Sequence, residues 1–351
     1  MTKEAYNVIG VMSGTSLDGI DLVYVSLFPS DWSYSIIHAD TIAYSENWHS
    51  DLKDSIHLNK DQLKDLDISY TRLLAKTIAT FIDTHAITDI DAVCSHGHTV
   101  LHQPENALTY QIGNRPELAT MIGQKVVCDF RVQDVKFGGQ GAPLVPIGDR
   151  LLFSDYKYCL NLGGFANVSF ENNTERSAFD VCPVNIVMNH YCQLVDLSYD
   201  DKGNLASRGN INHTLLQDLD NVPFYTQKPP KSLGLEWVKG TIVPLIDSYQ
   251  LTTNDILRTF VEHIAIQIGH ILKDHGNVLV TGGGVFNDFL ISRIKELSEG
   301  EIVIPSKEII EYKEALIFGL LGVLRLRDEV NCLSSVTGAS RDHSSGKIFM
   351  P

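Results

Sequence analysis

Long apolar segments are missing from this sequence of 351 residues. The longest uninterrupted apolar run, Ala315 to Leu324, has ten residues, and a membrane-spanning helix needs about twice as many. The run therefore predicts a buried helix. The first ten residues, "MTKEAYNVIG", carry charge and show no apolar core of the kind found in signal peptides. We expect no membrane partner and a cytoplasmic location.

An excess of basic residues is also missing, since 43 acidic residues outnumber 28 basic ones and the net charge is −15. Nucleic-acid surfaces depend on clustered Lys and Arg, so we expect no nucleic-acid partner. A small anion remains an acceptable ligand, because turn amides and helix ends bind anions without net positive charge. The six cysteines include no C-x-x-C pair, which predicts reduced, buried thiols.

Two apolar stretches near the N-terminus are separated by the polar turn "SGTSLDG". They predict a hairpin whose first strand runs from Tyr6 to Met12. Its turn either is simply well formed, because Gly, Ser and Asp favour turns, or offers backbone N–H groups to an anion. The sequence lacks the G-x-x-x-x-G-K-[ST] pattern of a P-loop.

A second hairpin is predicted by "YKYCLNLGGFANVSF", in which a Gly-Gly turn again separates two apolar strands. One such hairpin in each half indicates an internal duplication. The glycine- and proline-rich stretch "FGGQGAPLVP" is typical of a connection between domains. The polar tail "SVTGASRDHSSG" is expected on the surface, and a helix is expected from Lys60 to His85, where apolar residues recur at helical spacing.

Three other motifs leave alternatives open. "VTGGGVFN" follows a buried strand but has Asn287 where a dinucleotide-binding fingerprint has its third glycine. His96, His98 and His102 share one stretch, yet no Cys, Asp or Glu completes a metal-ligand set at tight spacing. Asp180 precedes a helix, where an acid is either a favourable charge at the helix N-terminus or a general base.

Taken together, these stretches resemble the anhydro-N-acetylmuramic acid kinases of the actin/hexokinase/Hsp70 ATPase superfamily. The resemblance is carried in order by "GVMSGTSLDGID", "SHGHTVLHQP", "YQIGNRPELA", "DFRVQDVKFGGQGAPLVP", "NLGGFANV", "FDVCPVN", "KSLGLEW", "VTGGGVFN", "EALIFGLL" and "SVTGAS". It implies an α/β fold with two actin-like (ribonuclease H-like) domains and an interdomain cleft. The first domain is expected at 1–131 plus 328–351 and the second at 132–327.

The resemblance also implies the reaction and its residues. ATP, with Mg²⁺ as cofactor, phosphorylates O6 of 1,6-anhydro-N-acetylmuramic acid as water opens the anhydro ring, and Asp180 is the catalytic base. A homodimer is the expected assembly. Sugar-binding candidates are His96, Arg131, Asn185 and Glu314. Candidates for ATP binding are Ser13, Gly14, Thr15, Ser16, Leu17, Asp18, Gly19, Ile20, Gly163, Gly164, Gly282, Gly283 and Gly284.

The sequence departs from the family pattern at several places. After Asp180 it reads Val-Cys-Pro-Val-Asn where the family usually has Thr-Gly-Pro-Gly-Asn. His98 stands where Gln is common, and Leu233 and Leu235 replace the usual Thr and Arg. A kinase of the same fold acting on another amino sugar and a nucleotide-regulated binding module are the alternative functions.

Overall fold

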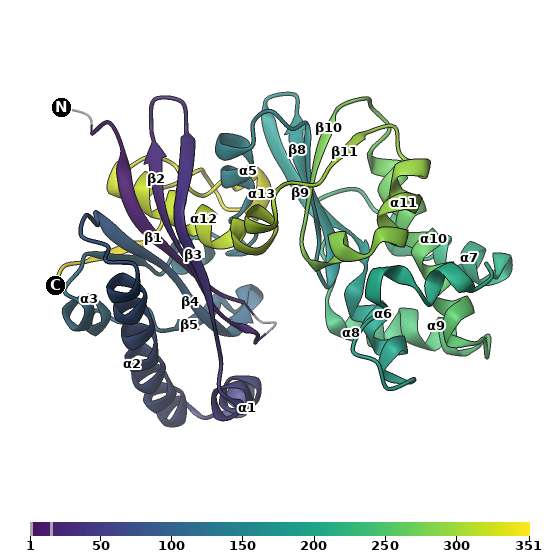
Figure 1. The fold of residues 1–351 in the computed structure, drawn as a ribbon, viewed down its shortest axis with the longest axis horizontal. Helices are drawn as coiled ribbons and strands as arrows, with labels where there is room; N and C mark the ends of the chain where they lie inside the picture. The colour runs from purple at the N-terminus through teal and green to yellow at the C-terminus, as the bar shows by residue number, and fades with distance from the viewer. Residues whose placement is uncertain (1–2, 15–16) are drawn as a thin grey trace. The chain divides into compact units, whose positions relative to one another are not determined.

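The computed structural model describes residues 3–14 and 17–351, which form two compact units (Figure 1). Unit 1 comprises the chain up to Leu152 together with Tyr312–Pro351, and unit 2 comprises Phe153–Glu311. The division differs from the predicted domains, because 132–152 and 312–327 group with unit 1. Within the described residues, no helix is both long and apolar enough to cross a membrane.

Unit 1 is built on a mixed sheet with the strand order β12-β6-β4-β1-β2-β3, and β5 pairs with β4. Helix α12 begins in unit 2 and continues through unit 1. The elements are β1 (Tyr6–Ser13), β2 (Gly19–Phe28), β3 (Ser33–Ala43), α1 (Glu46–Asp54), α2 (Lys60–Thr84), β4 (Ala92–Gln103), β5 (Leu108–Ile112), α3 (Glu117–Ile122), β6 (Val126–Cys128), α4 (Val132–Lys136), α5 (Pro146–Leu152), α12 (Lys307–Leu326), α13 (Ser334–Thr337) and β12 (Lys347–Phe349).

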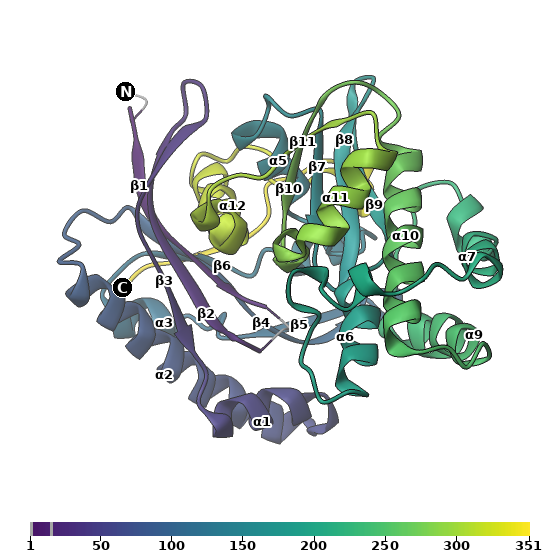
Figure 2. The same cartoon turned by 45° about the vertical axis from the view of Figure 1, so that its right-hand side comes forward.

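Strand β1 is buried on both faces, which explains why its sequence is apolar without alternation. Successive side chains of a strand point to opposite faces. Ile9 and Val11 belong to the core that includes helix α2, whereas Gly10 faces α12 on the other side. Helices α2 and α12 therefore cover opposite faces of the sheet (Figure 2).

Glycines let α12 approach the sheet at backbone distance. A Cβ on Gly10 would lie 1.9 Å from the Ala315 carbonyl oxygen, and one on Gly322 would lie 2.1 Å from Cys94 Sγ. A Cβ on Gly319 would lie 3.7 Å from the Cα atom of Gly10. This close packing places the predicted buried helix 315–324 in unit 1. The sequence analysis had assigned these residues to the second domain.

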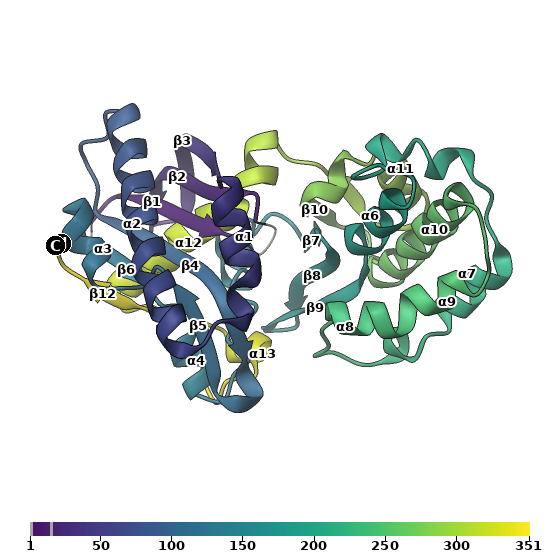
Figure 3. The same ribbon diagram turned by 90° about the horizontal axis from the view of Figure 1, so that it is seen from below.

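Unit 2 is built on a smaller sheet with the order β11-β10-β7-β8-β9. Helices α6, α10 and α11 contribute to its core, and α7 packs beside α10 (Figure 3). The elements are β7 (Tyr158–Leu162), β8 (Phe165–Asn172), β9 (Glu175–Pro183), α6 (Asn185–Gln193), α7 (His213–Asp220), α8 (Leu235–Trp237), α9 (Val243–Asp247), α10 (Thr253–Ile271), β10 (Asn277–Thr281), α11 (Asp288–Leu297) and β11 (Glu301–Val303).

The two sheets repeat one plan. In each, the first three strands of the unit pair antiparallel in sequence, as β1-β2-β3 and as β7-β8-β9. In unit 1, β1 also pairs parallel with β4, and β4 pairs parallel with β6. In unit 2, β7 likewise pairs parallel with β10, and β10 pairs parallel with β11. The repeated plan confirms the expected two-unit α/β fold of the actin-like type.

The predicted surface position of the polar tail holds for residues 335, 338 and 340–342, which are exposed, but it is wrong for the buried residues between and after them. Thr337, His343 and Ser345 are at most 6% exposed. Their polar atoms are accommodated by partners far away in the sequence, because Thr337 Oγ1 donates to Asp134 and Ser345 Oγ donates to the Phe130 carbonyl oxygen. Strand β12 then pairs with β6, so the tail is part of unit 1.

Candidate active site

The first glycine hairpin joins β1 to β2 in unit 1. Leu17 has φ of 61°, and its N–H donates to the Gly14 carbonyl oxygen at 3.4 Å. Asp18 is exposed, whereas Gly19 and Ile20 are buried in β2. A Cβ on Gly19 would lie 2.5 Å from the Ile42 carbonyl oxygen, so this glycine is required by strand packing. Thr15 and Ser16 lie outside the described residues.

The end of β1 is fixed by a chain of buried polar side chains. Ser13 Oγ lies 2.6 Å from the Tyr44 hydroxyl and 3.0 Å from His98 Nδ1. The Tyr44 hydroxyl lies 2.7 Å from that of Tyr70. Ser13 is 3% exposed, so its hydroxyl anchors the start of the hairpin inside unit 1.

We expect His98 to make the stability of the protein depend on acid pH. Burial lowers the pKa of His98 to about 4, against about 6.5 in an unfolded chain. Between these values the unfolded state binds the extra proton, so stability present above pH 6.5 is lost as the pH falls toward 4. The loss should reach about 2–3 kcal/mol between pH 7 and pH 4.5.

Urea unfolding of the wild type and of His98→Gln at these two pH values measures the effect. The Gln variant should lose less stability on acidification, by about that amount, since glutamine does not titrate. His49→Gln replaces an exposed histidine and serves as the control. Equal acid sensitivity in all three proteins would contradict the assignment.

A second polar group in unit 1 is built around Arg131, which follows β6. Arg131 Nε donates to His96 Nε2 at 2.8 Å, and Nη1 donates to the Gly141 carbonyl oxygen at 2.7 Å. Burial and the neighbouring guanidinium hold the pKa of His96 well below its usual range, so this ring is neutral and accepts. Desolvation lowers the pKa of Arg131, and the carboxylate of Glu314 on α12 opposes this. The structure thus brings three predicted sugar-binding residues of unit 1 together.

In unit 2 the second glycine hairpin meets the triple glycine. The N–H groups of Val184 and Asn185 donate to the Gly164 and Gly163 carbonyl oxygens at 2.8 and 3.3 Å. Asn185 Nδ2 donates to the Leu162 carbonyl oxygen. Gly282 has φ of 85°, and its own Cβ would lie 2.8 Å from the Leu162 carbonyl carbon. The hairpin turn, the start of α6 and the loop 282–284 therefore lie side by side.

Asp180 lies on β9, close to this hairpin, and is half-buried. Its Oδ2 accepts the Leu233 N–H at 2.8 Å, and its own N–H donates to the Lys231 carbonyl oxygen at 3.1 Å. Burial raises the pKa of Asp180 above its ordinary value, and the Leu233 N–H partly opposes this. A half-buried carboxylate with a raised pKa is suited to accept a proton.

The loop that holds Asp180 was missed by sequence reasoning. Lys231 and Leu233 act through backbone groups, and a backbone donor has no signature in residue type. The replacement of the family's Thr by Leu233 therefore keeps the contact with Asp180. The unusual Val-Cys-Pro-Val segment is also fixed by packing, because the side chains of Val181, Cys182 and Val184 are at most 4% exposed.

Comparison with known proteins gives these residues a context. The family model for anhydro-N-acetylmuramic acid kinase matches residues 6–351. The chain belongs to the anhydro-N-acetylmuramic acid kinase family. It is 31% identical over 363 residues to the anhydro-N-acetylmuramic acid kinase of Hydrogenovibrio crunogenus, with 98% of each chain covered. It is 34% identical over 364 residues to that of Pseudomonas syringae pv. syringae, covering 97% of this chain and 98% of the relative.

Among solved structures, the kinase is similar to (R)-2-hydroxyglutaryl-CoA dehydratase component A of Acidaminococcus fermentans. The TM-score is 0.48 at 12% identity, and 90% of this chain and 97% of that chain are covered. The family match confirms the resemblance stated from the sequence, and with it the enzyme class of an ATP-dependent sugar kinase. The roles of single residues in this kinase stay predictions.

Proposed function

We propose that this kinase opens the 1,6-anhydro ring of 1,6-anhydro-N-acetylmuramic acid with water and phosphorylates O6, giving N-acetylmuramic acid 6-phosphate for peptidoglycan recycling. The proposal rests on the family match over residues 6–351. One structural observation supports it most directly, which is the half-buried Asp180 carboxylate with its raised pKa beside the second glycine hairpin.

The reaction couples two displacements. Asp180 takes a proton from water, and the water oxygen forms a bond to the anomeric carbon. The bond between that carbon and O6 breaks, and O6 bonds to the γ-phosphorus of ATP as the bond to the β-phosphate oxygen breaks. The Leu233 N–H orients the Asp180 carboxylate through Oδ2, so the base is held in one position before substrate arrives.

The proposed ATP-binding segments are the first glycine hairpin in unit 1 and, in unit 2, the second hairpin and the loop 282–284. Phosphoryl transfer depends mainly on positioning and on electrostatic stabilisation, which turn amides provide at close range. In unit 2, a Cβ on Gly164 would come no closer than 3.8 Å to Ile186, and one on Gly283 no closer than 3.9 Å to Asn185. The surfaces of these two glycines are therefore open to a ligand. A Cβ on Gly163 would lie 3.1 Å from Asn161 Nδ2, and Gly282 and Gly284 are confined by Leu162.

Mg²⁺ is the proposed metal of the ATP site. Mg²⁺ prefers carboxylate and water oxygens and binds through few protein ligands. Asp18 is an exposed carboxylate beside the first hairpin, so its chemistry fits the ion. When bound, Mg²⁺ supplies positive charge to the phosphates.

Arg131 is the proposed partner of the lactyl carboxylate of the sugar. Its guanidinium is held by His96 and by the Gly141 carbonyl oxygen, and a fixed planar cation suits a carboxylate or phosphate. His96, Glu314 and, from unit 2, Asn185 complete the proposed sugar-binding set. A homodimer and a cytoplasmic location are further parts of the proposal, and all six cysteines are free and buried, in line with a reducing compartment.

A panel of amino sugars tests the proposed substrate. We expect ADP release to depend on 1,6-anhydro-N-acetylmuramic acid and to be far slower with N-acetylmuramic acid, with 1,6-anhydro-N-acetylglucosamine or without sugar. 1,6-Anhydro-N-acetylglucosamine lacks only the lactyl group, so it also tests Arg131. Preference for a sugar without the anhydro ring would contradict the proposed reaction while leaving the kinase class intact.

A further inference from the structure

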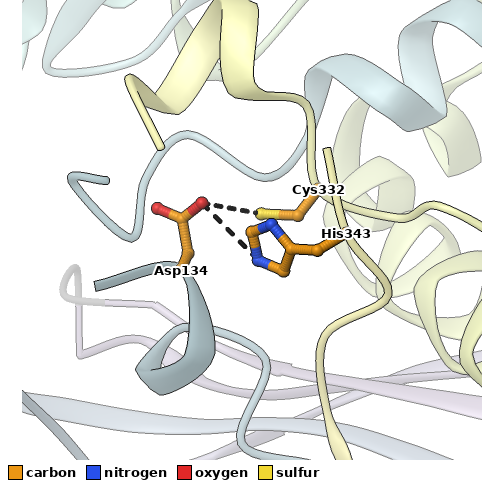
Figure 4. A group of neighbouring side chains, drawn as sticks. All are labelled: Asp134, Cys332 and His343. Atoms are coloured by element: carbon orange, nitrogen blue, oxygen red, sulfur yellow. Dashed lines mark hydrogen bonds and ion pairs between the residues drawn. The ribbon is translucent and has the colours of Figure 1, made fainter. Parts of the chain in front are cut away.

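A buried cluster in unit 1 combines three side chains that bind metals, and it lies outside the proposed active site. Asp134, Cys332 and His343 are 0%, 1% and 6% exposed. Asp134 Oδ1 accepts hydrogen bonds from Cys332 Sγ at 3.3 Å and from Thr337 Oγ1 at 2.7 Å, and it lies 3.7 Å from His343 Nε2. Figure 4 shows both side chains directed at one oxygen of Asp134. One ligand atom from each residue lies within 4.8 Å of the others.

Among the described residues, the imidazole of His343 presents a ring nitrogen without a hydrogen-bond partner to this oxygen of Asp134. Its Nδ1 lies 3.1 Å from the Arg341 carbonyl oxygen, which only accepts, so Nδ1 carries the proton. Within the described residues, Nε2 is a buried atom without a hydrogen-bond partner. In a neutral ring its lone pair faces the negatively charged Asp134 oxygen at 3.7 Å, and a cation between the two atoms would turn this repulsion into attraction.

The surrounding structure holds these three side chains as a metal site does. Cys332 and His343 form an antiparallel bridge, so their side chains start side by side. Metal-ligating histidines commonly donate the other N–H to a backbone carbonyl, and ligating carboxylates are themselves hydrogen-bonded. Here Arg341 provides that carbonyl, and Gly141 N–H donates to Asp134 Oδ2 at 2.7 Å.

We propose that Asp134, Cys332 and His343 bind a zinc-class divalent cation. Zn²⁺ takes Cys sulfur, His nitrogen and carboxylate oxygen at about 2.0–2.3 Å, and ligand atoms separated as these are can be bridged by such bonds with small adjustments. Mg²⁺ and Ca²⁺ prefer oxygen ligands and fit poorly. On binding, the Cys332 thiol loses its proton to solvent and its sulfur bonds to the metal.

The cation would stabilise the segment of unit 1 that positions Arg131, a proposed sugar-binding residue. Asp134 lies on α4, directly after Arg131, and it accepts from the N–H of Gly141, whose carbonyl oxygen accepts from Arg131. The other two ligands belong to the C-terminal tail. The site would therefore tie the tail to the segment that orients Arg131, without contacting the substrate.

The test uses the full-length kinase, stripped of metal by dialysis against a chelator and titrated with Co²⁺ alone and with Zn²⁺ alone. We expect about one equivalent of Co²⁺ per chain, a thiolate-to-cobalt charge-transfer absorption, and displacement of Co²⁺ by Zn²⁺ but not by Mg²⁺. Cys332→Ser should abolish that absorption. His343→Gln should weaken Zn²⁺ binding by about 10-fold or more.

His49→Gln removes an exposed histidine and should bind both metals as the wild type does. Substoichiometric binding by the wild type would overturn the proposal, and so would an absorption that persists in Cys332→Ser. Either result would mean that the cluster is held by hydrogen bonds alone. If Cys332→Ser does not fold, the wild-type Co²⁺ titration decides alone.

Discussion

Replacement of Asp180 by Asn is expected to lower kcat by about 10²- to 10⁴-fold, which is the typical contribution of a positioned general base. The amide keeps the size of the side chain and can still accept the Leu233 N–H through its oxygen, but it cannot take a proton from water. ATP affinity, measured by calorimetry, should change little because the glycine hairpins are unaltered. Steady-state ADP release with the anhydro sugar measures the loss.

Asp200→Asn provides a matched control in the same unit. Asp200 is 7% exposed and accepts the backbone N–H groups of Leu205 and Ala206, so its loss should lower stability and leave kcat per folded molecule nearly unchanged. In ¹⁸O-labelled water, the wild-type product should carry label on the anomeric hydroxyl at early times and none in its phosphate. Label in phosphate would mean simple ATP hydrolysis and would rule out the coupled reaction.

The pH dependence of the wild type follows from the same carboxylate. A general base must be unprotonated, and burial raises the pKa of Asp180. The acid limb of kcat/KM should therefore lie at higher pH than an exposed aspartate would give. This limb should be absent from the residual activity of Asp180→Asn, because the residue that titrates has been removed.

Gly10→Ala is expected to lower the free energy of unfolding by about 3 kcal/mol or more, at the upper end of overpacking effects. Its Cβ would lie 1.9 Å from the Ala315 carbonyl oxygen and 2.9 Å from the carbonyl carbon. These are backbone atoms inside α12, so no side chain can rotate to make room. The helix must move from β1, which opens space along the rest of the interface. Urea unfolding of the two proteins measures the difference.

Gly240→Ala is the matched control, because no atom lies within 4 Å of its built Cβ. It lies in the helical segment Val238–Ile242, where alanine is favoured over glycine by up to about 1 kcal/mol. The control should therefore be neutral or slightly stabilising. A Gly10→Ala protein as stable as the wild type would show that α12 does not pack against β1 at this distance.

The sequence predicted best where the signal was local. Helix α2 covers Lys60–Thr84, against a prediction of 60–85, because apolar spacing over many turns depends on nearby residues alone. The two glycine hairpins were found for the same reason, since glycines and flanking apolar strands are visible in the letters. Their repetition gave the duplicated plan.

Contacts between distant residues could not be predicted in this way. Its polar character predicted the tail on the surface, yet Thr337 and Ser345 are buried. Burial is possible because the Thr337 hydroxyl donates a hydrogen bond to Asp134 and the Ser345 hydroxyl donates one to the Phe130 carbonyl oxygen. The Leu233 N–H that orients Asp180 is a backbone group and leaves no trace in composition. The observed boundary between the units also differs from the predicted one. In the sequence, the α12 glycines that allow close packing against β1 cannot be told apart from other residues of an apolar run.

The pairing of β12 with β6 has a consequence for synthesis of the chain. Unit 2 is one continuous segment, so all its strands have been made once residue 311 has left the ribosome. Domains generally fold as units during translation. Unit 1 begins first, yet the strand that covers β6 arrives only with Lys347–Phe349. Unit 1 is thus completed after unit 2, and the edge of β6 stays open to wrong partners until β12 has been made.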